Sequence, residues 1–456
     1  MQKSPGYITI AAYGSIAFPL AAAFIALQVF VPTFYAESTG LSLTSIGIVL
    51  LIARLCDTVT DPLVGYLSDK TPTSWQRRKL YVVVATPLIA ISTFYLLNPP
   101  ETTGTTYLLI WTICIYVAGT LSIVPLGAWG AELSSDYNKR SLIAGVRVAF
   151  GLTGSLAALL FAVMLSADDS ANLGATLSGI TWLVIGTLIV TTVLIAFLVP
   201  DNNDTTLPEN TISEAWKVVS RPTPFRQLLG SFFLNAVGNA IPASLFVLFV
   251  THVIDAPDAV GRLLFLYFVC SALSVPFWVA VSKRIGKHQT WTVAILLAAA
   301  FFIWTPFLDG SSLGWFYLIV IVTGFATGAD LVLPAAINGD LIEWDALQSG
   351  YKRPGLFFAL WGTATKLSFA LAIGIAFPLL DLVGFSATGV NDGNAIQGLA
   401  LLYGLPCIGF KLTALLLMRG YPITAAVHAD IRRQLEAKEL TDSTLPKRDE
   451  MNQATD

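Results

Sequence analysis

Long apolar runs, separated by short polar segments, recur from one end of the chain to the other. Each run is about 20 residues or longer, which is the length at which an α-helix crosses the ~30 Å hydrocarbon layer of a bilayer. The apolar positions within a run are continuous rather than alternating, which indicates helices, because a helix satisfies its backbone hydrogen bonds internally. The pattern predicts twelve membrane-spanning helices, over residues 10–34, 42–66, 80–98, 106–131, 142–166, 176–200, 226–252, 259–281, 289–309, 313–338, 355–381 and 396–419.

The composition agrees with a chain that lies mostly in lipid. Hydrophobic residues make up 55% of the 456 residues and charged residues 12%, whereas soluble domains carry about 25% charged residues. Too few polar side chains remain to cover a water-facing surface, so the bilayer is the expected environment. The sequence shows no nucleophile–base pair, metal-ligand spacing or nucleotide-binding loop. We therefore expect a monomeric protein that is not an enzyme, needs no cofactor or resident metal and binds no nucleic acid.

Lysine and arginine residues fall in alternate loops. They occur in loops 67–79, 132–141, 282–288 and 339–354, in the middle segment 201–225 and in the C-terminal tail, whereas the intervening loops hold none. By the positive-inside rule, the basic loops and both termini face the cytoplasm. Loops this compact favour the inner membrane of a bacterium.

The polar segment at residues 201–225 divides the spans into six and six. Such duplication is typical of transporters whose solute binds at mid-membrane between two repeats. We expect a six-helix bundle over 1–200, a cytoplasmic linker over 201–225, a second six-helix bundle over 226–419 and a cytoplasmic tail over 420–456.

The loops after spans 2 and 8 carry corresponding clusters of charge. The first covers residues 65–70 (GYLSDK) and 77–79 (RRK), and the second covers residues 282–287 (SKRIGK). The first resembles the G-x-x-x-D-[RK] motif of the major facilitator superfamily, and the second resembles its degenerate copy. An acid among basic residues at a helix end can hold two helices in one state; the alternative is a positive-inside anchor with an incidental aspartate. The candidate latch residues are Asp69, Lys70, Arg77 and Arg78.

Ionisable side chains within a span are costly and mark functional sites. The second span holds Arg54, Asp57 and Asp61, whose spacing of three and four residues places them on one helical face. Two carboxylates one turn apart repel each other unless a cation lies between them. Pro62 leaves one backbone carbonyl without its helical donor, and Thr60 adds a hydroxyl, so the segment predicts an oxygen-rich cation site. The alternative is a neutralised Arg–Asp cluster that serves helix packing.

Other polar side chains within the spans are weaker candidates. Lys366 lies in the middle of span 11, too deep to reach the interface easily, and Asp330 lies within span 10. Arg147 is near the end of span 5, and Trp361 is the tryptophan that we expect to face a cavity. Lys411 in span 12 is interpreted as a lysine whose ammonium reaches the membrane surface.

The segment Ala53–Pro62 resembles the A-R-x-x-D-x-x-[NT]-D-P signature of the glycoside–pentoside–hexuronide:cation symporters, the branch of the major facilitator superfamily that includes melibiose permease. Supporting similarities lie at residues 130–137, 328–331 and 364–366 and at Asp340, so the resemblance covers essentially the whole chain. It implies a twelve-helix, 6+6 pseudo-symmetric major facilitator fold that works by alternating access.

The resemblance also implies roles for individual side chains. It implies that Lys366 couples the cation to the solute and that Arg147 belongs to the solute site. With these we group Arg54 as a coupling residue, and Asp330 and Trp361 as candidates for solute binding. The cation-binding residues that the resemblance implies are Asp57, Thr60, Asp61 and Thr120.

The chain departs from the family's sugar-binding pattern, because Ala21 and Ile123 stand where melibiose permease has the two aspartates that bind the galactoside. The leading hypothesis is a symporter that couples Na⁺ or H⁺ to the transport of a small organic solute, such as a sugar, glycoside or uronate. Arg147 and Lys366 favour an acidic sugar by a small margin. The alternative is a cation-coupled transporter of a lysolipid or other amphiphile, which animal relatives of the family carry with the same cation site.

Overall fold

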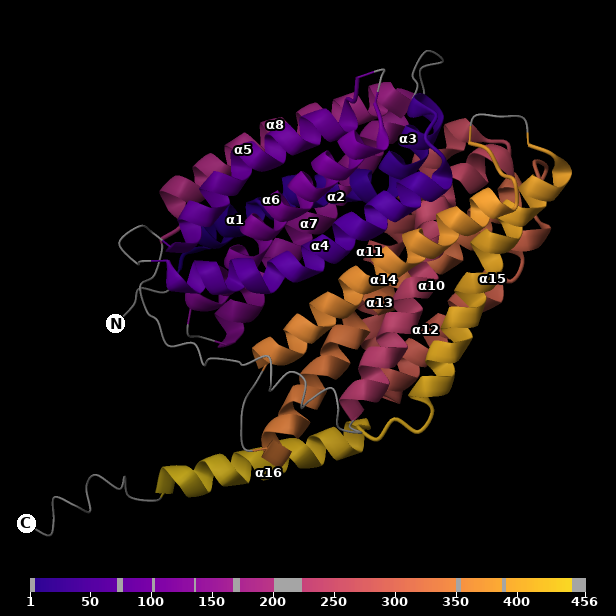
Figure 1. Ribbon diagram of the computed structural model, residues 1–456. Coiled ribbons are helices and arrows are strands. Elements are labelled where there is room, and N and C mark those ends of the chain that lie inside the picture. Colours follow the sequence, from indigo (N-terminus) through magenta and orange to yellow (C-terminus); the bar gives the residue numbers. More distant parts are fainter. Residues whose placement is uncertain are drawn as a thin grey trace, which may run out of the picture.

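The computed structural model describes residues 5–71, 77–100, 103–134, 137–166, 173–200, 224–349, 354–387 and 391–444. Within these residues the regular structure is helical throughout, and twelve helices are long and apolar enough to cross a membrane (Figure 1). The predicted all-α class with twelve spans is therefore confirmed. The segment 201–223 and the end of the tail lie outside the described residues, so the division into two bundles and a linker stays a prediction.

The helices of the first half begin with a span that is broken into three pieces. These are α1 (Tyr7–Ser15), α2 (Ala17–Ile25) and α3 (Val31–Thr39), with a π-helical turn at Ala26–Phe30 between the last two. Pro19 and Pro32 lie in this span, and proline removes a helical hydrogen bond and favours such irregular turns. The other helices of this half are α4 (Leu43–Lys70), α5 (Arg77–Leu97), α6 (Thr105–Glu132), α7 (Tyr137–Ser166) and α8 (Leu173–Leu198).

The second half has one helix more than its spans require, because the tail also folds as a helix. Its spans are α10 (Pro224–His252), α11 (Val260–Ile285), α12 (Lys287–Phe302), α13 (Leu313–Ser349), α14 (Pro354–Leu382) and α15 (Gly393–Met418), followed by α16 (Ala425–Thr444).

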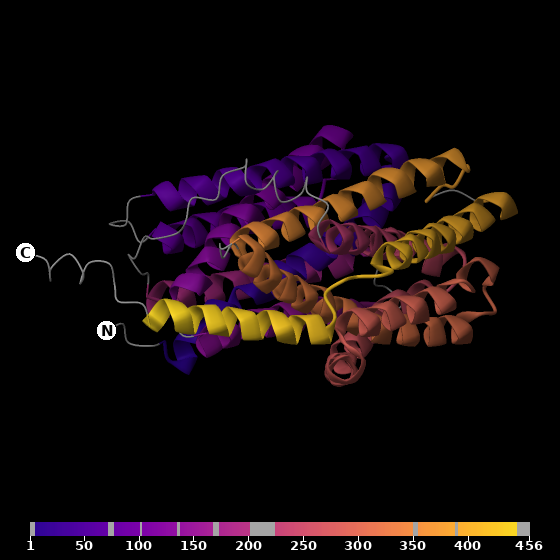
Figure 2. The same ribbon diagram turned by 90° about the horizontal axis from the view of Figure 1, so that it is seen from below.

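Helix α13 continues beyond the predicted end of its span at residue 338, and the tail helix lies against this extension. The Nζ atom of Lys287 on α12 lies 2.6 Å from Oδ1 of Asp340, and Nε2 of His428 on α16 lies 2.9 Å from Oε2 of Glu343. Figure 2 shows α16, the lower yellow helix, extending from the second-half helices to a position that in this view overlies helices of the first half. These polar contacts join the extension of α13 to α12 and α16.

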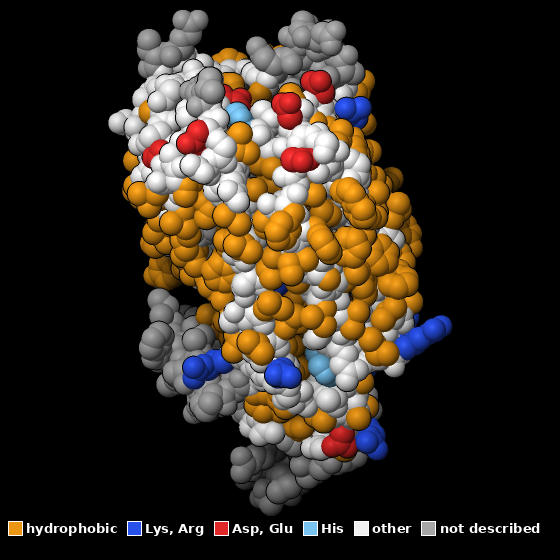
Figure 3. All heavy atoms as spheres, turned by 90° about the vertical axis from the view of Figure 1, so that its right-hand side faces the viewer, with side chains coloured by type: hydrophobic (Ala, Val, Ile, Leu, Met, Phe, Trp, Pro, Cys, Tyr) orange, Lys and Arg blue, Asp and Glu red, His pale blue; other side chains and the backbone are white. Residues whose placement is uncertain are grey.

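The surface separates into an apolar middle and two polar ends. On the face drawn in Figure 3, hydrophobic side chains cover the middle of the molecule, acidic side chains gather mostly at one end and basic side chains mostly at the other. Such a band fits the hydrocarbon layer of a bilayer, with charged groups in water on both sides. The protein is therefore a multi-pass membrane protein.

The buried apolar residues form one core that joins the halves and two cores that do not. The joint core includes Tyr35, Leu43 and Leu96 of the first half with Phe249 and Phe316 of the second. Among the described buried residues, the other two cores belong to one half each, and they lie toward the basic loops. The two groups of helices accordingly meet at one end and diverge at the other (Figure 1). Among the described residues, the core that joins the halves therefore lies at the end away from the basic loops.

Helices α4 and α14 pack closely across the boundary between the halves, because each has a glycine where the other helix contacts it. A Cβ atom on Gly47 would lie 3.0 Å from Cβ of Phe377, and a Cβ atom on Gly374 would lie 2.8 Å from Cδ2 of Leu51. The helices run antiparallel, so residues roughly two to three turns farther toward the basic loops also face each other. Those residues include Asp57 and Lys366.

We expect Gly154→Ala to destabilise the fold, whereas Gly151→Ala on the same helix should be tolerated. An added Cβ at Gly154 would collide with the backbone carbonyl of Phe18 on α2, whereas one at Gly151 would find its nearest neighbour at 3.9 Å. Overpacking of this kind costs about 1–3 kcal/mol. Thermal unfolding of the two purified variants checks this; equal melting temperatures would contradict the close approach of α2 and α7.

Candidate functional site

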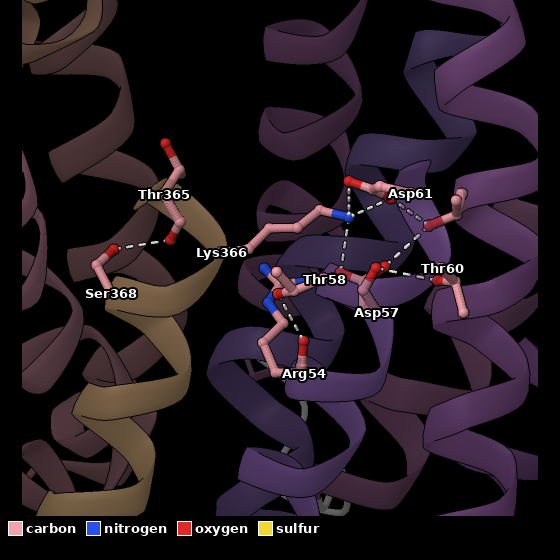
Figure 4. A network of polar contacts seen from close by, with 9 residues as sticks. Arg54, Asp57, Thr58, Thr60, Asp61, Thr365, Lys366 and Ser368 are labelled. Atoms are coloured by element: carbon pink, nitrogen blue, oxygen red, sulfur yellow. Dashed lines mark hydrogen bonds and ion pairs between the residues drawn. The ribbon is translucent and has the colours of Figure 1, made fainter. Parts of the chain in front are cut away.

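Two carboxylates of the first half meet one ammonium of the second half near the centre of the molecule (Figure 4). The Nζ atom of Lys366 on α14 lies 2.9 Å from Oδ2 of Asp57 and 2.7 Å from Oδ2 of Asp61, both on α4. The side chain of Asp57 is 3% exposed, whereas those of Asp61 and Lys366 are 31% and 23% exposed. Asp57 is therefore the buried end of the site, and Asp61 with Lys366 is its partly exposed end.

Thr120 on α6 contacts both carboxylates at once. Its Oγ1 atom lies 2.8 Å from Oδ1 of Asp57 and 2.9 Å from Oδ1 of Asp61. A hydroxyl has a single hydrogen, so only one of these contacts can be a donated hydrogen bond at any moment. The other contact brings lone pairs together unless a proton or metal ion lies between the oxygens. The three oxygens thus form a group that a small cation would stabilise.

Arg54 neutralises the inner carboxylate. Its Nη1 atom lies 3.2 Å from Oδ2 of Asp57, and its Cζ atom lies 4.7 Å from the ring centroid of Tyr116 on α6. The guanidinium is almost fully buried, and its Nε atom has no hydrogen-bond partner among the described residues. With Lys366 it balances the two aspartates, so the cluster is formally neutral before any cation enters.

The hydroxyl of Thr60 is directed differently from the hydroxyl of Thr120. Thr60 donates to the backbone carbonyl of Asp57 at 3.0 Å, within its own helix. Only its lone pairs therefore remain for a cation, and Thr120 is the threonine that contacts the carboxylates.

Asp330 lies in a second buried network, within the second half. Its Oδ1 atom accepts from Nε1 of Trp291 on α12 at 2.6 Å, and its Oδ2 atom accepts from Nδ2 of Asn239 on α10 at 2.9 Å. The Oδ1 atoms of Asn239 and Asn235 accept from Nζ of Lys411 at 2.6 and 3.1 Å. The interpretation of Lys411 as a lysine that reaches the membrane surface is wrong, because the residue is 2% exposed and its ammonium is held by α10.

The structure does not bring Arg147 or Trp361 to either network. Arg147 lies beside Tyr13 of α1, and a Cβ atom on Gly127 of α6 would lie 3.7 Å from its Nη1. The ring of Trp361 stacks on that of Phe232, with centroids 3.8 Å apart. Their roles in solute binding stay predictions, and neither side chain lines the cavity described below.

Of the candidate latch residues, one has a described side chain. Arg78 is 1% exposed, and its Nη1 atom donates to Oγ of Ser68 at 2.8 Å, which joins α5 to α4. The side chains of Asp69, Lys70 and Arg77 lie outside the described residues. The latch therefore stays a prediction.

An apolar cavity of about 220 Å³ lies chiefly within the second half, where the halves meet. Its wall includes Tyr267, Phe302 and Tyr403, with Asn239 and Lys411 among its polar members. Phe369 on α14 also lines it, and the ring of Phe369 lies 5.9 Å from Cζ of Arg54. The ring of Phe369 and the guanidinium of Arg54 thus lie between the cavity and Asp57.

The sequence-based reasoning missed the amide side chains of this second network. Asn235 and Asn239 lie four residues apart in the middle of span 7, which places them on one helical face. A pair of buried amides is an available signal for a polar partner on a neighbouring helix.

The comparisons with known proteins agree with the fold and the motifs. The family model for MFS/sugar transport proteins matches residues 12–425. A sodium-dependent lysophosphatidylcholine symporter 1 from Gallus gallus is 23% identical, over 86% of this chain and 81% of its own. An isoprimeverose transporter from Lactiplantibacillus pentosus is 22% identical, over 84% of this chain and 82% of its own.

A solved structure supports the same fold. The crystal structure of the nucleoside transporter NupG covers 91% of this chain and 100% of its own, with a TM-score of 0.66 and 10% identity. Twelve apolar helices, the charged signature in the second span and the family match over residues 12–425 lead to one conclusion. The chain is a transporter of the major facilitator superfamily and belongs to the MFS/sugar transport protein family.

Proposed function

We propose that this protein is a symporter that couples the entry of Na⁺ or H⁺ to the transport of a small organic solute. The observation that carries the proposal is the contact of Lys366 on α14 with Asp57 and Asp61 on α4, a three-membered ionic cluster between the halves. Relatives named as symporters support it, including a sodium-dependent one.

The proposed coupling is a competition for the same oxygens. Without a bound cation, the ammonium of Lys366 neutralises the two carboxylates and ties α14 to α4. A cation that enters past Asp61 takes over those oxygens together with Thr120, so the ammonium is released. Lys366 belongs to the second half and the two carboxylates to the first, so release of the ammonium removes a contact between the halves. The relative free energies of the conformations in which the halves meet differently then change.

The proposed orientation places the basic loops and both termini in the cytoplasm, in a bacterial inner membrane. The alternating clusters of lysine and arginine support this orientation. In it, the core that joins the halves lies toward the outer face of the membrane, which supports an inward-open state. The cation and the solute would leave toward the basic loops.

Two classes of solute remain candidates, and different observations favour them. A sugar or glycoside is favoured by the family match and by the relative that carries isoprimeverose. An amphiphile is favoured by the apolar and aromatic wall of the cavity and by the lysophosphatidylcholine symporters among the relatives. Arg147 does not line this cavity, so the cavity itself lends no support to the part of the acidic-sugar preference that rested on Arg147.

Reconstitution into liposomes tests the proposal. Uptake of radiolabelled phenyl glucoside, phenyl glucuronide and lysophosphatidylcholine should exceed empty-liposome uptake for at least one solute, and only when an inward Na⁺ or H⁺ gradient is imposed. Collapse of that gradient with an ionophore should remove the concentrative part of the uptake. Uptake that is indifferent to both gradients would contradict symport.

A further inference from the structure

The ammonium of Lys411 has a donor to spare at the wall of the cavity. An ammonium carries three N–H donors. Two are accepted by the amide oxygens of Asn235 and Asn239, at 3.1 and 2.6 Å. Within the described part of the chain no partner accepts the third, although Lys411 is only 2% exposed. Lys411 also lines the cavity.

Asp330 carries the negative charge nearest to this ammonium in the network, and its oxygens already accept hydrogen bonds from other donors. Asp330 accepts from Trp291 and from Asn239, one bond for each carboxylate oxygen. Asn239 stands between the carboxylate and the ammonium, because its Nδ2 atom donates to Asp330 while its Oδ1 atom accepts from Lys411. Asp330 does not line the cavity, so the charge that the network presents there is positive.

The rest of the described cavity wall carries no formal charge, although it has polar members, namely Gln28, Asn239, Thr323, Thr327 and the hydroxyls of Tyr267 and Tyr403. It is built mainly from apolar and aromatic side chains, among them Phe246, Phe302 and Phe316. An anion placed against such a wall would lose its hydration without compensation unless a cationic donor met it. Among the described residues of that wall, Lys411 is the one with a cationic side chain.

We propose that Lys411 binds the acidic group of the transported solute, and that this solute is an organic anion with an apolar part. The acidic group accepts the third N–H of the ammonium, while the apolar part lies against the aromatic wall. Asn235 and Asn239 hold the ammonium in place through its other two donors. The inference rests on the proposed function, since it assigns the cavity to the transported solute.

The charges of the two sites complement each other under this proposal. The cluster of Arg54, Lys366, Asp57 and Asp61 is formally neutral, so a bound cation makes it positive. An anionic solute on Lys411 adds the opposite charge beyond the ring of Phe369, which lies 5.9 Å from Cζ of Arg54. Opposite charges in a low-dielectric interior attract, so the cation and the anion should raise each other's affinity.

Equilibrium binding to the purified protein in nanodiscs tests the inference, with matched probes that differ by an acidic group. Phenyl glucuronide is compared with phenyl glucoside for a carboxylate, and lysophosphatidic acid with monoacylglycerol for a phosphate. For at least one pair, the acid should bind about tenfold or more tightly, as a charge-assisted hydrogen bond in an apolar site implies. The pair that shows the preference identifies the acidic group.

Variants of Lys411 locate the source of that preference. In Lys411→Met the acid and its neutral partner should bind within about twofold of each other, and in Lys411→Arg the preference should return in part, because Arg retains the charge. Lys283→Met, which removes an exposed lysine, should leave the preference unchanged. If Lys411→Met does not fold, the preference for the acid is still measured in the wild type and in Lys411→Arg, and these two values test the inference.

Two outcomes would overturn the inference: a wild-type protein that binds neither acid better than its neutral partner, or a Lys411→Met variant that keeps the preference. The binding experiment needs no cation gradient, so it is independent of the uptake experiment. Acid preference without gradient-driven uptake would refute the symport proposal and leave the anion site in place. Gradient-driven uptake without acid preference would refute the anion site and leave the symport proposal in place.

Discussion

Asp57→Asn should abolish solute uptake driven by a cation gradient while the protein still folds and inserts. Asn has nearly the same shape as Asp but lacks the charge, and Asp57 contacts Arg54, Thr120 and Lys366 at once. Asn offers a cation a neutral amide oxygen in place of a charged carboxylate. The loss of this charged ligand should weaken cation binding by about 100-fold or more, or about 3 kcal/mol. Uptake into proteoliposomes and cation titration of the purified variant measure the two effects.

A matched substitution separates this effect from a general loss of acidic charge. Asp309 lies in the loop between α12 and α13, away from the carboxylates of α4. Hydrogen bonds from Ser311 and Ser312 hold the pKa of its carboxyl below the usual value. Asp309→Asn should transport like the wild type. Concentrative uptake by Asp57→Asn at the level of Asp309→Asn would show that the aspartates of α4 serve packing alone.

Lys366→Met should uncouple the solute from the cation. Removal of the ammonium leaves two carboxylates, with Arg54 as their remaining cation, so the site should bind Na⁺ or H⁺ more tightly and release it more slowly. Removal of one partner of a buried ion pair destabilises the folded protein by about 3–5 kcal/mol. The lower end of this range applies because the Lys366 side chain is 23% exposed. We expect gradient-driven uptake to fall by about tenfold or more, with a lower dissociation constant for the cation.

The control for this variant is Lys283→Met, which removes a lysine at the exposed end of α11. It should change neither the uptake nor the affinity for the cation. The coupling role of Lys366 would be wrong if Lys366→Met transported with the cation dependence of this control.

The twelve spans were predictable because hydropathy reports directly on whether a segment can lie in lipid. The ends of the helices were less so. Helix α13 runs to Ser349 rather than stopping at residue 338, and Lys287 and His428 contact the acidic side chains of this extension. Those partners come from other helices, and a hydropathy pattern carries no information about them. The breaks around α2 had a local signal in Pro19 and Pro32.

The candidate site was predictable to the extent that one helix contains it. The spacing of Arg54, Asp57 and Asp61 fixed their common face, and the structure has them there. The meeting of that face with Lys366 and Thr120 depends on which helices are neighbours, and the resemblance to a known family supplied it. Lys411 shows the limit, since its length would allow it to reach the membrane surface. Only the neighbouring α10 determines that it turns inward.

The ionic contact between α14 and α4 also has a consequence for the direction of transport. If separation of the halves changes the affinity for the cation by some factor, the cation changes the equilibrium between the separated and joined states by the same factor. This reciprocity has no preferred direction, because the contacts of Lys366 with Asp57 and Asp61 are the same whichever way the ion arrived. The sign of net flux is therefore set by the electrochemical gradients alone. Under reversed gradients, the same chain would export what it otherwise imports.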